Sequence, residues 1–379
     1  TRYHFYGWVI NAKIKGMDFS SSSEEKLIRE SLKKLLESFS SEDYLKKFDS
    51  HRYDPALLSE LINQGFIVDQ DTNKINFDVI KILSEELGYS NSPLNPSALV
   101  SDVLITLQES SFKGLSEILK DLLSNKLYSY TSALNEPLNF EIESPKVTGK
   151  LSNNGYELSG TKILSYNLDI AKKALISFIT DDGVYLALIE TDQLEITSLD
   201  VTSKVPYSKL NLDGVIVNKE SIINKSGEGL YLLENIYARR VLIQASLARG
   251  MVLKMLELTA AYTSEREQFD RPIGSFQAVS HRAANMFIDH QELDLNLQQA
   301  SYLYSSGSDL ENQILNLKYI TGNVLHRSSY AAQHLHGGMG VAKEYPLWRY
   351  CLSAKEHEII NGNSSSALEA LSKNITLNQ

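Results

Sequence analysis

Residues 266–277 carry side chains that suit a phosphate-bearing cofactor. The segment reads REQFDRPIGSFQ, and within it Arg266 offers a fixed cation with forked donors, which fits a pyrophosphate. Phe269 offers a flat face for a ring system, and Gln277 both donates and accepts hydrogen bonds. Taken alone, an arginine at a helix end is usually a solvated charge, and a phenylalanine usually belongs to the core.

Residues 333–340, with the sequence QHLHGGMG, form a second such segment. Gly337 and Gly338 allow the backbone to approach a ligand without an intervening Cβ. A glycine pair after a helix is, by itself, commonly a C-terminal cap. The two segments together, in this order, predict a cofactor that combines phosphate with a flat ring.

The elements that must position these segments follow from periodicity. Residues 17–127 show helical spacing of apolar residues, residues 128–225 show alternating and β-branched runs, and residues 226–379 return to helical spacing. The pattern predicts a mainly α protein with a central β domain. Residues 1–16 are expected to be an extension before Met17.

Individual elements can be assigned within these domains. Ser20 to Ser23 supply hydroxyls for an N-cap, with Glu24 and Glu25 in the first turn. We expect helices at residues 55–64, 77–87, 115–123, 230–262, 285–305 and 312–336, and strands at residues 146–151, 156–159, 174–179, 184–189 and 215–217.

Composition limits the class of protein. The chain has 379 residues, 42% of them hydrophobic, and no apolar run long enough to cross a bilayer. The formal net charge of −10 and the absence of a basic stripe disfavour a nucleic-acid partner. Cys351 is the only cysteine, so no intrachain disulfide can form, no Cys-based metal site is expected, and a cytoplasmic location fits.

These motifs resemble those of the acyl-CoA dehydrogenase family. The resemblance rests on Arg266 with Phe269, on Gln333 with the glycine pair, and on residues 344–346 (Glu-Tyr-Pro). Upstream, residues 136–137 (Glu-Pro), 160–162 (Gly-Thr-Lys) and 227–229 (Gly-Glu-Gly) match further family motifs, so the resemblance covers about residues 18–370.

The resemblance implies an N-terminal helical domain, a middle β-barrel-like domain and a C-terminal four-helix bundle. It also implies FAD between the β domain and the C-terminal helices, an acyl-CoA thioester as substrate, an electron-transfer acceptor, and an oligomer or a heteromer with a homologous subunit. The residues that match family contacts are Arg266, Gln268, Phe269 and Gln277 for adenosine and pyrophosphate from one subunit, Gln333, Gly337 and Gly338 from its partner, and Leu134, Tyr166, Asn363 and Ser365 for the flavin.

The reaction half of the pattern departs from the family. The usual base, a Glu before a Gly, is replaced by Asn361, and an amide cannot accept a proton as a base does. The alternative base position on the long C-terminal helix holds Arg240, a cation. Glu356 and Glu358 lie near and would either substitute for the base or form a solvated acidic face.

Several functions are compatible with this combination. The chain could act alone with a displaced base, or act as one subunit of a heteromer whose partner supplies the base. It could also be a flavin-dependent monooxygenase or oxidase of the same fold, or a non-catalytic FAD-binding subunit. The sequence leaves these alternatives open.

Overall fold

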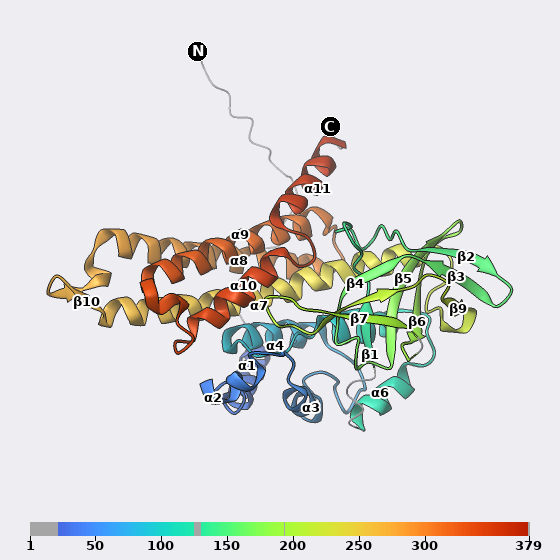
Figure 1. Cartoon of the computed structure of the whole chain (residues 1–379), viewed down its shortest axis with the longest axis horizontal. Coiled ribbons are helices and arrows are strands. Elements are labelled where there is room, and N and C mark those ends of the chain that lie inside the picture. The colour runs from blue at the N-terminus through green and yellow to red at the C-terminus, as the bar shows by residue number, and fades with distance from the viewer. Residues whose placement is uncertain (1–21, 125–129, 193, 378–379) are drawn as a thin grey trace, which may run out of the picture.

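The computed structural model describes residues 22–124, 130–192 and 194–377. The extension expected at residues 1–16 and the predicted domain boundary at residue 128 lie outside these residues. None of the helices in the described ranges combines the length and hydrophobicity needed to cross a membrane. Figure 1 shows a long helical bundle with a curled sheet against one end and the N-terminal helices beneath.

The N-terminal region is helical, as predicted. Ser22 caps the first helix: its Oγ accepts a hydrogen bond from the Glu25 backbone N–H (3.1 Å), and the Glu25 carboxylate accepts one from the Ser22 N–H (3.0 Å). The elements are α1 (Ser23–Glu37), α2 (Glu42–Leu45), η1 (Lys46–Phe48), α3 (Pro55–Asn63), α4 (Phe77–Ser90), the π-helical segment η2 (Ser97–Ile105), α5 (Thr106–Glu109) and α6 (Leu115–Leu123).

Two sheets form the middle region. Strands pair in the order β1-β5-β2-β3-β9 with β6 beside β5, and β4-β8-β7 form a separate three-stranded sheet. The strands are β1 (Tyr130–Ala133), β2 (Thr148–Ser152), β3 (Gly155–Ser159), β4 (Thr161–Tyr166), β5 (Lys173–Thr180), β6 (Gly183–Glu190), β7 (Glu195–Leu199), β8 (Tyr207–Asn211) and β9 (Ile216–Asn218). A separate core of apolar side chains, including Phe178 and Leu210, fills this region.

Long helices form the C-terminal region. They are α7 (Gly229–Glu265), α8 (Gln277–Ser306), α9 (Glu311–His336), α10 (Leu347–Ile359) and α11 (Ser364–Leu377). The short strands β10 (Glu267–Gln268) and β11 (Arg271–Pro272) lie in the turn after α7. The 3-10 turns are η3 (Lys219–Ser221), η4 (Ile273–Ser275) and η5 (Gly337–Val341). The predicted fold class, helices around a central β region with a C-terminal helical bundle, agrees with this arrangement (Figure 1).

The contact between α4 and α7 joins the N-terminal helices to the bundle. A Cβ on Gly88 would collide with the carbonyl oxygen of Leu247, and a Cβ on Gly250 would collide with that of Glu85. The two helix backbones therefore pack directly against each other, and this contact sets the position of α7 relative to η2.

Candidate functional site

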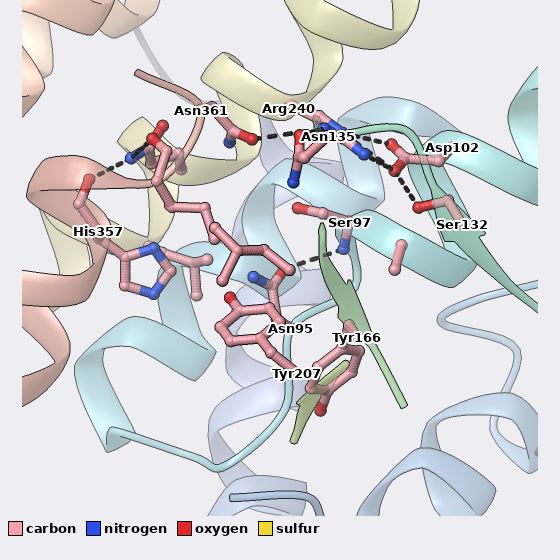
Figure 2. A pocket seen from close by; sticks show the side chains of 15 residues that line it. Asn95, Ser97, Asp102, Ser132, Asn135, Tyr166, Tyr207, Arg240, His357 and Asn361 are labelled. Atoms are coloured by element: carbon pink, nitrogen blue, oxygen red, sulfur yellow. Dashed lines mark hydrogen bonds and ion pairs between the residues drawn. The ribbon is translucent and has the colours of Figure 1, made fainter. Parts of the chain in front are cut away.

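A small, partly open cavity of about 40 Å³ lies where η2, the β4 and β8 strands, α7 and the end of α10 meet. Figure 2 shows its labelled side chains converging from these separate elements. Its polar lining comprises Asn95, Ser97, Asp102, Ser132, Asn135, Tyr166, Tyr207, Arg240, Gln244, His357 and Asn361. Both sequence positions at which a base was sought, Asn361 and Arg240, are therefore in this cavity.

Arg240 forms a buried ion pair with Asp102. Its Nε and Nη2 donate to the Asp102 carboxylate at 3.0 and 2.6 Å, and the Ser132 hydroxyl donates to the same carboxylate at 2.6 Å. Arg240 is 5% exposed and Asp102 is fully buried. Asp102 comes from the π-helical segment, a type of distortion that is frequent at functional sites. With its lone pairs engaged by these donors, the Asp102 carboxylate is poorly suited to act as a base.

The same guanidinium fixes two amide side chains. Arg240 Nη1 donates to Asn135 Oδ1 at 2.9 Å and contacts Asn361 Oδ1 at 3.5 Å (Figure 2). Because a guanidinium carries only donors, both amide oxygens must face it. Asn361 reaches this position from a left-handed backbone conformation, with φ of 59°. The two predicted base positions thus contact each other and neither presents a proton acceptor for catalysis.

Two long side chains hold the turn that presents Asn361. Lys318 on α9, fully buried, donates from Nζ to the carbonyl of Ile360 at 2.8 Å. Gln244 on α7 donates from Nε2 to the carbonyls of His357 and Ile360. These carbonyls are among the last of α10 and lack helical partners, so the two side chains cap the helix. Burial lowers the pKa of Lys318 to about 7.

Two buried polar atoms on this wall lack a hydrogen-bond partner among the described residues. They are Gln244 Oε1 and His357 Nδ1. Burial, with smaller contributions from Lys318 and Arg52, lowers the pKa of His357 to about 3, so its imidazole is neutral near pH 7. Buried polar atoms are nearly always paired, so two unpaired atoms in the residues around one cavity are an unusual feature of this wall.

The structure separates the two nearby carboxylates. Glu356 turns inward and accepts a hydrogen bond from the Tyr207 hydroxyl at 2.7 Å. Burial raises the pKa of Glu356. Glu358 turns outward and contacts Lys355 and His326. The interpretation as a solvated acidic face therefore suits Glu358 but not Glu356, which lies behind Tyr207 rather than in the cavity lining.

The segment at residues 266–277 lies at the far end of the bundle from the sheet, in the turn between α7 and α8 (Figure 1). Arg266, Gln268 and Gln277 are exposed there. Phe269 is 87% exposed and has a left-handed backbone, with φ of 56°. Its ring packs edge-on against Phe276, with centroids 6.1 Å apart, and its exposed face fits a ligand with a flat ring.

The glycine pair lies at the same end of the bundle. His336, the last residue of α9, stacks on Tyr262 near the end of α7, with ring centroids 4.5 Å apart. Gly337 has φ of 57°, and a Cβ on Gly338 would meet open space. The family resemblance assigned Arg266 and Gln333 to different subunits; in this chain both segments lie at the same end of the bundle, and the assignment to subunits stays a prediction. Twenty-six residues of α7 separate Arg240 from Arg266, about 39 Å at the rise of a helix.

The residues expected to contact the flavin are more dispersed. Tyr166 lines the cavity, and its ring packs edge-on against Tyr53 (5.8 Å) and Tyr207 (6.4 Å). Leu134 is buried just before Asn135. Asn363 and Ser365 are exposed beside the Asn361 turn, where Asn363 Oδ1 accepts a hydrogen bond from the Ser366 N–H. The exposed cation and ring at the far end fit the adenosine half of FAD.

Sequence reasoning missed Asp102, Asn135, Tyr207, Gln244 and His357 in the cavity, and Lys318 beside it. Asp102 had a local signal, because it is the only charge in the apolar run at residues 98–107. Arg240 is likewise a charge in an apolar helix. Opposite charges in such segments are candidates for a buried pair, but Arg239 directly precedes Arg240, so the sequence does not tell which arginine pairs with Asp102. The other residues carried no signal.

Comparisons with known proteins agree with this architecture. A family model described as "Acyl-CoA dehydrogenase, C-terminal domain" matches residues 227–376. Acyl-CoA dehydrogenase FadE27 of Mycobacterium tuberculosis is 29% identical over 231 residues, which are 58% of this chain. The match spans 61% of the length of FadE27.

Solved structures with this fold include the ChsE4-ChsE5 complex from Mycobacterium tuberculosis, with a TM-score of 0.86, 23% identity and coverage of 95% of this chain and 99% of the other. The FAD complex of PigA has a TM-score of 0.86 at 23% identity and covers 96% of this chain and 100% of the other. These likenesses confirm the predicted fold.

Proposed function

We propose that the chain is an FAD-binding oxidoreductase subunit of acyl-CoA dehydrogenase type, which the family model matched at residues 227–376 and the similarity to FadE27 support. It acts on the CH–CH group of an acyl-CoA thioester as one part of a heteromer, and a homologous partner chain supplies the base. One observation carries this proposal. The segment predicted to bind the cofactor, residues 266–277, is exposed, whereas the base position is filled by Arg240, Asp102 and Asn361.

The distance along α7 supports a site shared between chains. One extended dinucleotide does not reach from Arg240 to Arg266, which lie about 39 Å apart on a single helix. The far-end residues of one chain therefore serve a cofactor whose flavin lies against another chain. Such a site is incomplete in a monomer.

Residues can be assigned to the two halves of FAD. Arg266, Gln268, Phe269 and Gln277 of one chain would hold adenosine and pyrophosphate, together with Gln333, Gly337 and Gly338 of its partner. Leu134, Tyr166, Asn363 and Ser365 would face the flavin of a second FAD. The cofactor, when bound, supplies the acceptor for a hydride from the substrate β carbon.

The chain's own cavity cannot remove the α proton in the usual way. Asn361 and Arg240 offer no basic atom, and the Asp102 carboxylate accepts several hydrogen bonds. Glu356 cannot act as the base in the cavity, because Tyr207 lies between its carboxylate and the cavity. The partner's Glu at the position equivalent to Asn361 would remove the proton.

The test is reconstitution. The chain would be purified alone and together with a homologous chain that has the Glu, and each preparation would be assayed for flavin absorbance and for dye reduction by acyl-CoAs. We expect bound FAD and dye reduction only in the mixed preparation. Full activity of the chain alone would refute the need for a partner, and a mixed complex without flavin would refute the cofactor assignment.

A non-catalytic FAD-binding subunit is the second candidate. The buried Arg240–Asp102 pair favours it, because these two side chains occupy the base position and are poorly suited to accept a proton from a substrate. A mixed complex that retains FAD but is reduced by no acyl-CoA would select this candidate over the first.

A further inference from the structure

Helix α8 has one apolar face toward the bundle and a second one that the chain itself leaves uncovered. Its inward residues, among them Met286, Leu293 and Leu297, are buried. On the opposite side of the helix, Ile288 and Leu295 are 61% and 54% exposed. A helix that is apolar on both sides is normally buried on both.

The outward face of α8 nearly lacks charge. All of α8 belongs to the described part of the chain, and Glu292 is the only Asp, Glu, Lys or Arg among its exposed residues. Glu292 is itself paired with Arg327 of α9, at 3.1 Å. On α1, by contrast, most exposed residues are Glu or Lys, as is usual for a helix face in water. The outward face of α8 therefore has the composition of an interface rather than of a solvated surface.

The exposed residues of this face recur at the spacing of a helix–helix seam. We call them the α8 stripe: His281, Ala284, Ile288, Gln291, Glu292, Leu295, Gln299 and Tyr302. They fall within about 100° of the helix circumference, and the stripe is about 32 Å long. Steps of three and four residues are the pattern that lets one helix pack along another, so the occupant that fits the stripe is a helix.

The stripe is symmetric about its midpoint, which lies between Gln291 and Glu292. Residues at equal distances on either side of this midpoint form the pairs Ile288 with Leu295, Ala284 with Gln299, and His281 with Tyr302. In an antiparallel pair of two copies, each residue faces its counterpart from the other chain: apolar against apolar, small against long, and ring against ring. A two-fold interface needs such a self-match, because the same patch serves both chains.

The midpoint adds a polar match. In the antiparallel pair the Gln291 amide of one copy lies opposite the Glu292 carboxylate of the other, and the symmetry repeats this contact. Gln291 Nε2 contacts His290 Nδ1 at 3.2 Å and, as an amide nitrogen, has a second hydrogen to donate. No like charges lie directly opposite each other, because the stripe holds no other Asp, Glu, Lys or Arg.

We propose that α8 pairs antiparallel with α8 of a second copy of this chain through the stripe. The pairing goes beyond the proposed function, since it requires neither FAD nor a thioester. A complex with the homologous partner would then contain two copies of this chain.

Sedimentation velocity of the full chain, without added cofactor, tests the pairing. At micromolar concentration we expect twice the mass of one chain. Ile288→Glu places a carboxylate against Leu295 of the other copy, twice in each pair, and should weaken association about a hundredfold or more. Its far-UV circular dichroism should not change, because the side chain lies outside the chain's own core.

Leu27→Glu is the matched control, at a 65% exposed position on α1, and should leave association unchanged. A wild-type chain that stays monomeric, or an Ile288→Glu chain that pairs as tightly as the wild type, would overturn the proposal.

Disulfide cross-linking tests the direction of the pair and does not depend on a disruptive variant. The native cysteine, Cys351, is buried and should not react. On oxidation, the double variant Ile288→Cys with Leu295→Cys should form a covalent dimer on a non-reducing gel. Neither single variant should do so, since equivalent positions of the two copies lie about 10 Å apart along the helices, beyond the reach of a disulfide. Covalent dimers of the single variants would indicate a parallel pair and overturn the proposal, as would a double variant that does not cross-link.

The outcomes also separate this proposal from the proposed function. If the homologous chain covers the stripe instead, this chain is monomeric alone and Ile288→Glu blocks only the mixed complex. An active mixed complex of that kind would refute the pairing of copies alone. A chain that pairs with itself, but whose mixed complex is reduced by no acyl-CoA, would refute the dehydrogenase function alone.

Discussion

Arg240 and Asp102 form a buried charged pair in the lining of the cavity. As a pair they are neutral, and the carboxylate is held by donors from Arg240 and Ser132. A buried pair of this kind contributes little net stability over an apolar replacement, but loss of one partner leaves an uncompensated buried charge. Through Arg240, which bonds to Asn135 and contacts Asn361, the pair shapes the lining of the cavity.

Asp102→Asn should therefore be strongly destabilising. It removes the charge that compensates Arg240 while keeping the size of the side chain, and we expect a loss of about 3–5 kcal/mol in the free energy of unfolding. Urea denaturation at pH 7 measures it. Asp200→Asn, which breaks the exposed pair with Lys204, is the control and should cost about 1 kcal/mol or less. Equal losses would contradict the account.

The residues of the cavity were accessible from the sequence to different degrees. Arg240 and Asn361 could be located because they lie at fixed distances from motifs. Asp102 lies 138 residues before Arg240, so no local pattern joins the two. Gln244, His357 and Tyr207 depend on which way a side chain turns, and that is decided by packing between domains.

At the scale of elements, α10 depends on a cap supplied by another helix. Lys318 on α9 donates to the carbonyl of Ile360 just after α10, close to the cavity but outside its lining. Its pKa near 7 reflects burial, which disfavours the charged amine. The position of the Asn361 turn is therefore linked to a group that titrates near neutral pH.

Lys318→Met should change the pH dependence of stability. In the folded protein the pKa is lowered to about 7, whereas the ordinary lysine value is 10.5. Between these values the unfolded chain binds more protons, so the contribution of Lys318 to the free energy of unfolding rises with pH. Urea denaturation at pH 7 and pH 9 measures the free energy of unfolding, and the variant should lack this rise between the two pH values. Lys254→Met, at a partly exposed site, should keep it; an unchanged slope in Lys318→Met would contradict the assignment.

Elements with clear periodicity were predictable and the others were not. The helices α3, α6 and α9 match their expected ranges within one residue, because their apolar residues recur at helical spacing. Strands β4, β7 and β8 were not identified. β7 has no buried residue and β4 contains a bulge after Lys162, so neither shows simple alternation. Helix α8 begins at Gln277 rather than at residue 285, since it follows the turn directly.

For the whole molecule, the order of the three regions followed from the change of periodicity along the chain. The placement of the cofactor segments did not. Residues 266–277 and 333–340 lie at one end of the bundle only because α7 and α9 end near each other, as the stacking of His336 on Tyr262 shows. Sequence spacing carries no information on which helix ends meet, so the position of both segments at one end of the bundle could not be predicted.

Phe269→Ala tests the far end of the bundle. The side chain is exposed, so the melting temperature should not change. In a complex with the partner chain, loss of a stacking ring should weaken retention of FAD roughly tenfold, as measured by flavin absorbance after gel filtration. Leu151→Ala, at a 65% exposed position on β2, is the control and should retain FAD fully. Unchanged retention in Phe269→Ala would remove this segment from the cofactor site.

The length of α7 has a thermodynamic consequence. If each dinucleotide is held by two chains, cofactor binding and chain association are linked equilibria, and each strengthens the other by the same factor. Dilution should then release FAD even when the free cofactor is held constant, and added FAD should shift sedimentation toward the assembled form. Because α7 carries residues for the flavin of one cofactor along its length and residues for the adenosine of another at its end, the fraction of chains with bound FAD depends on protein concentration.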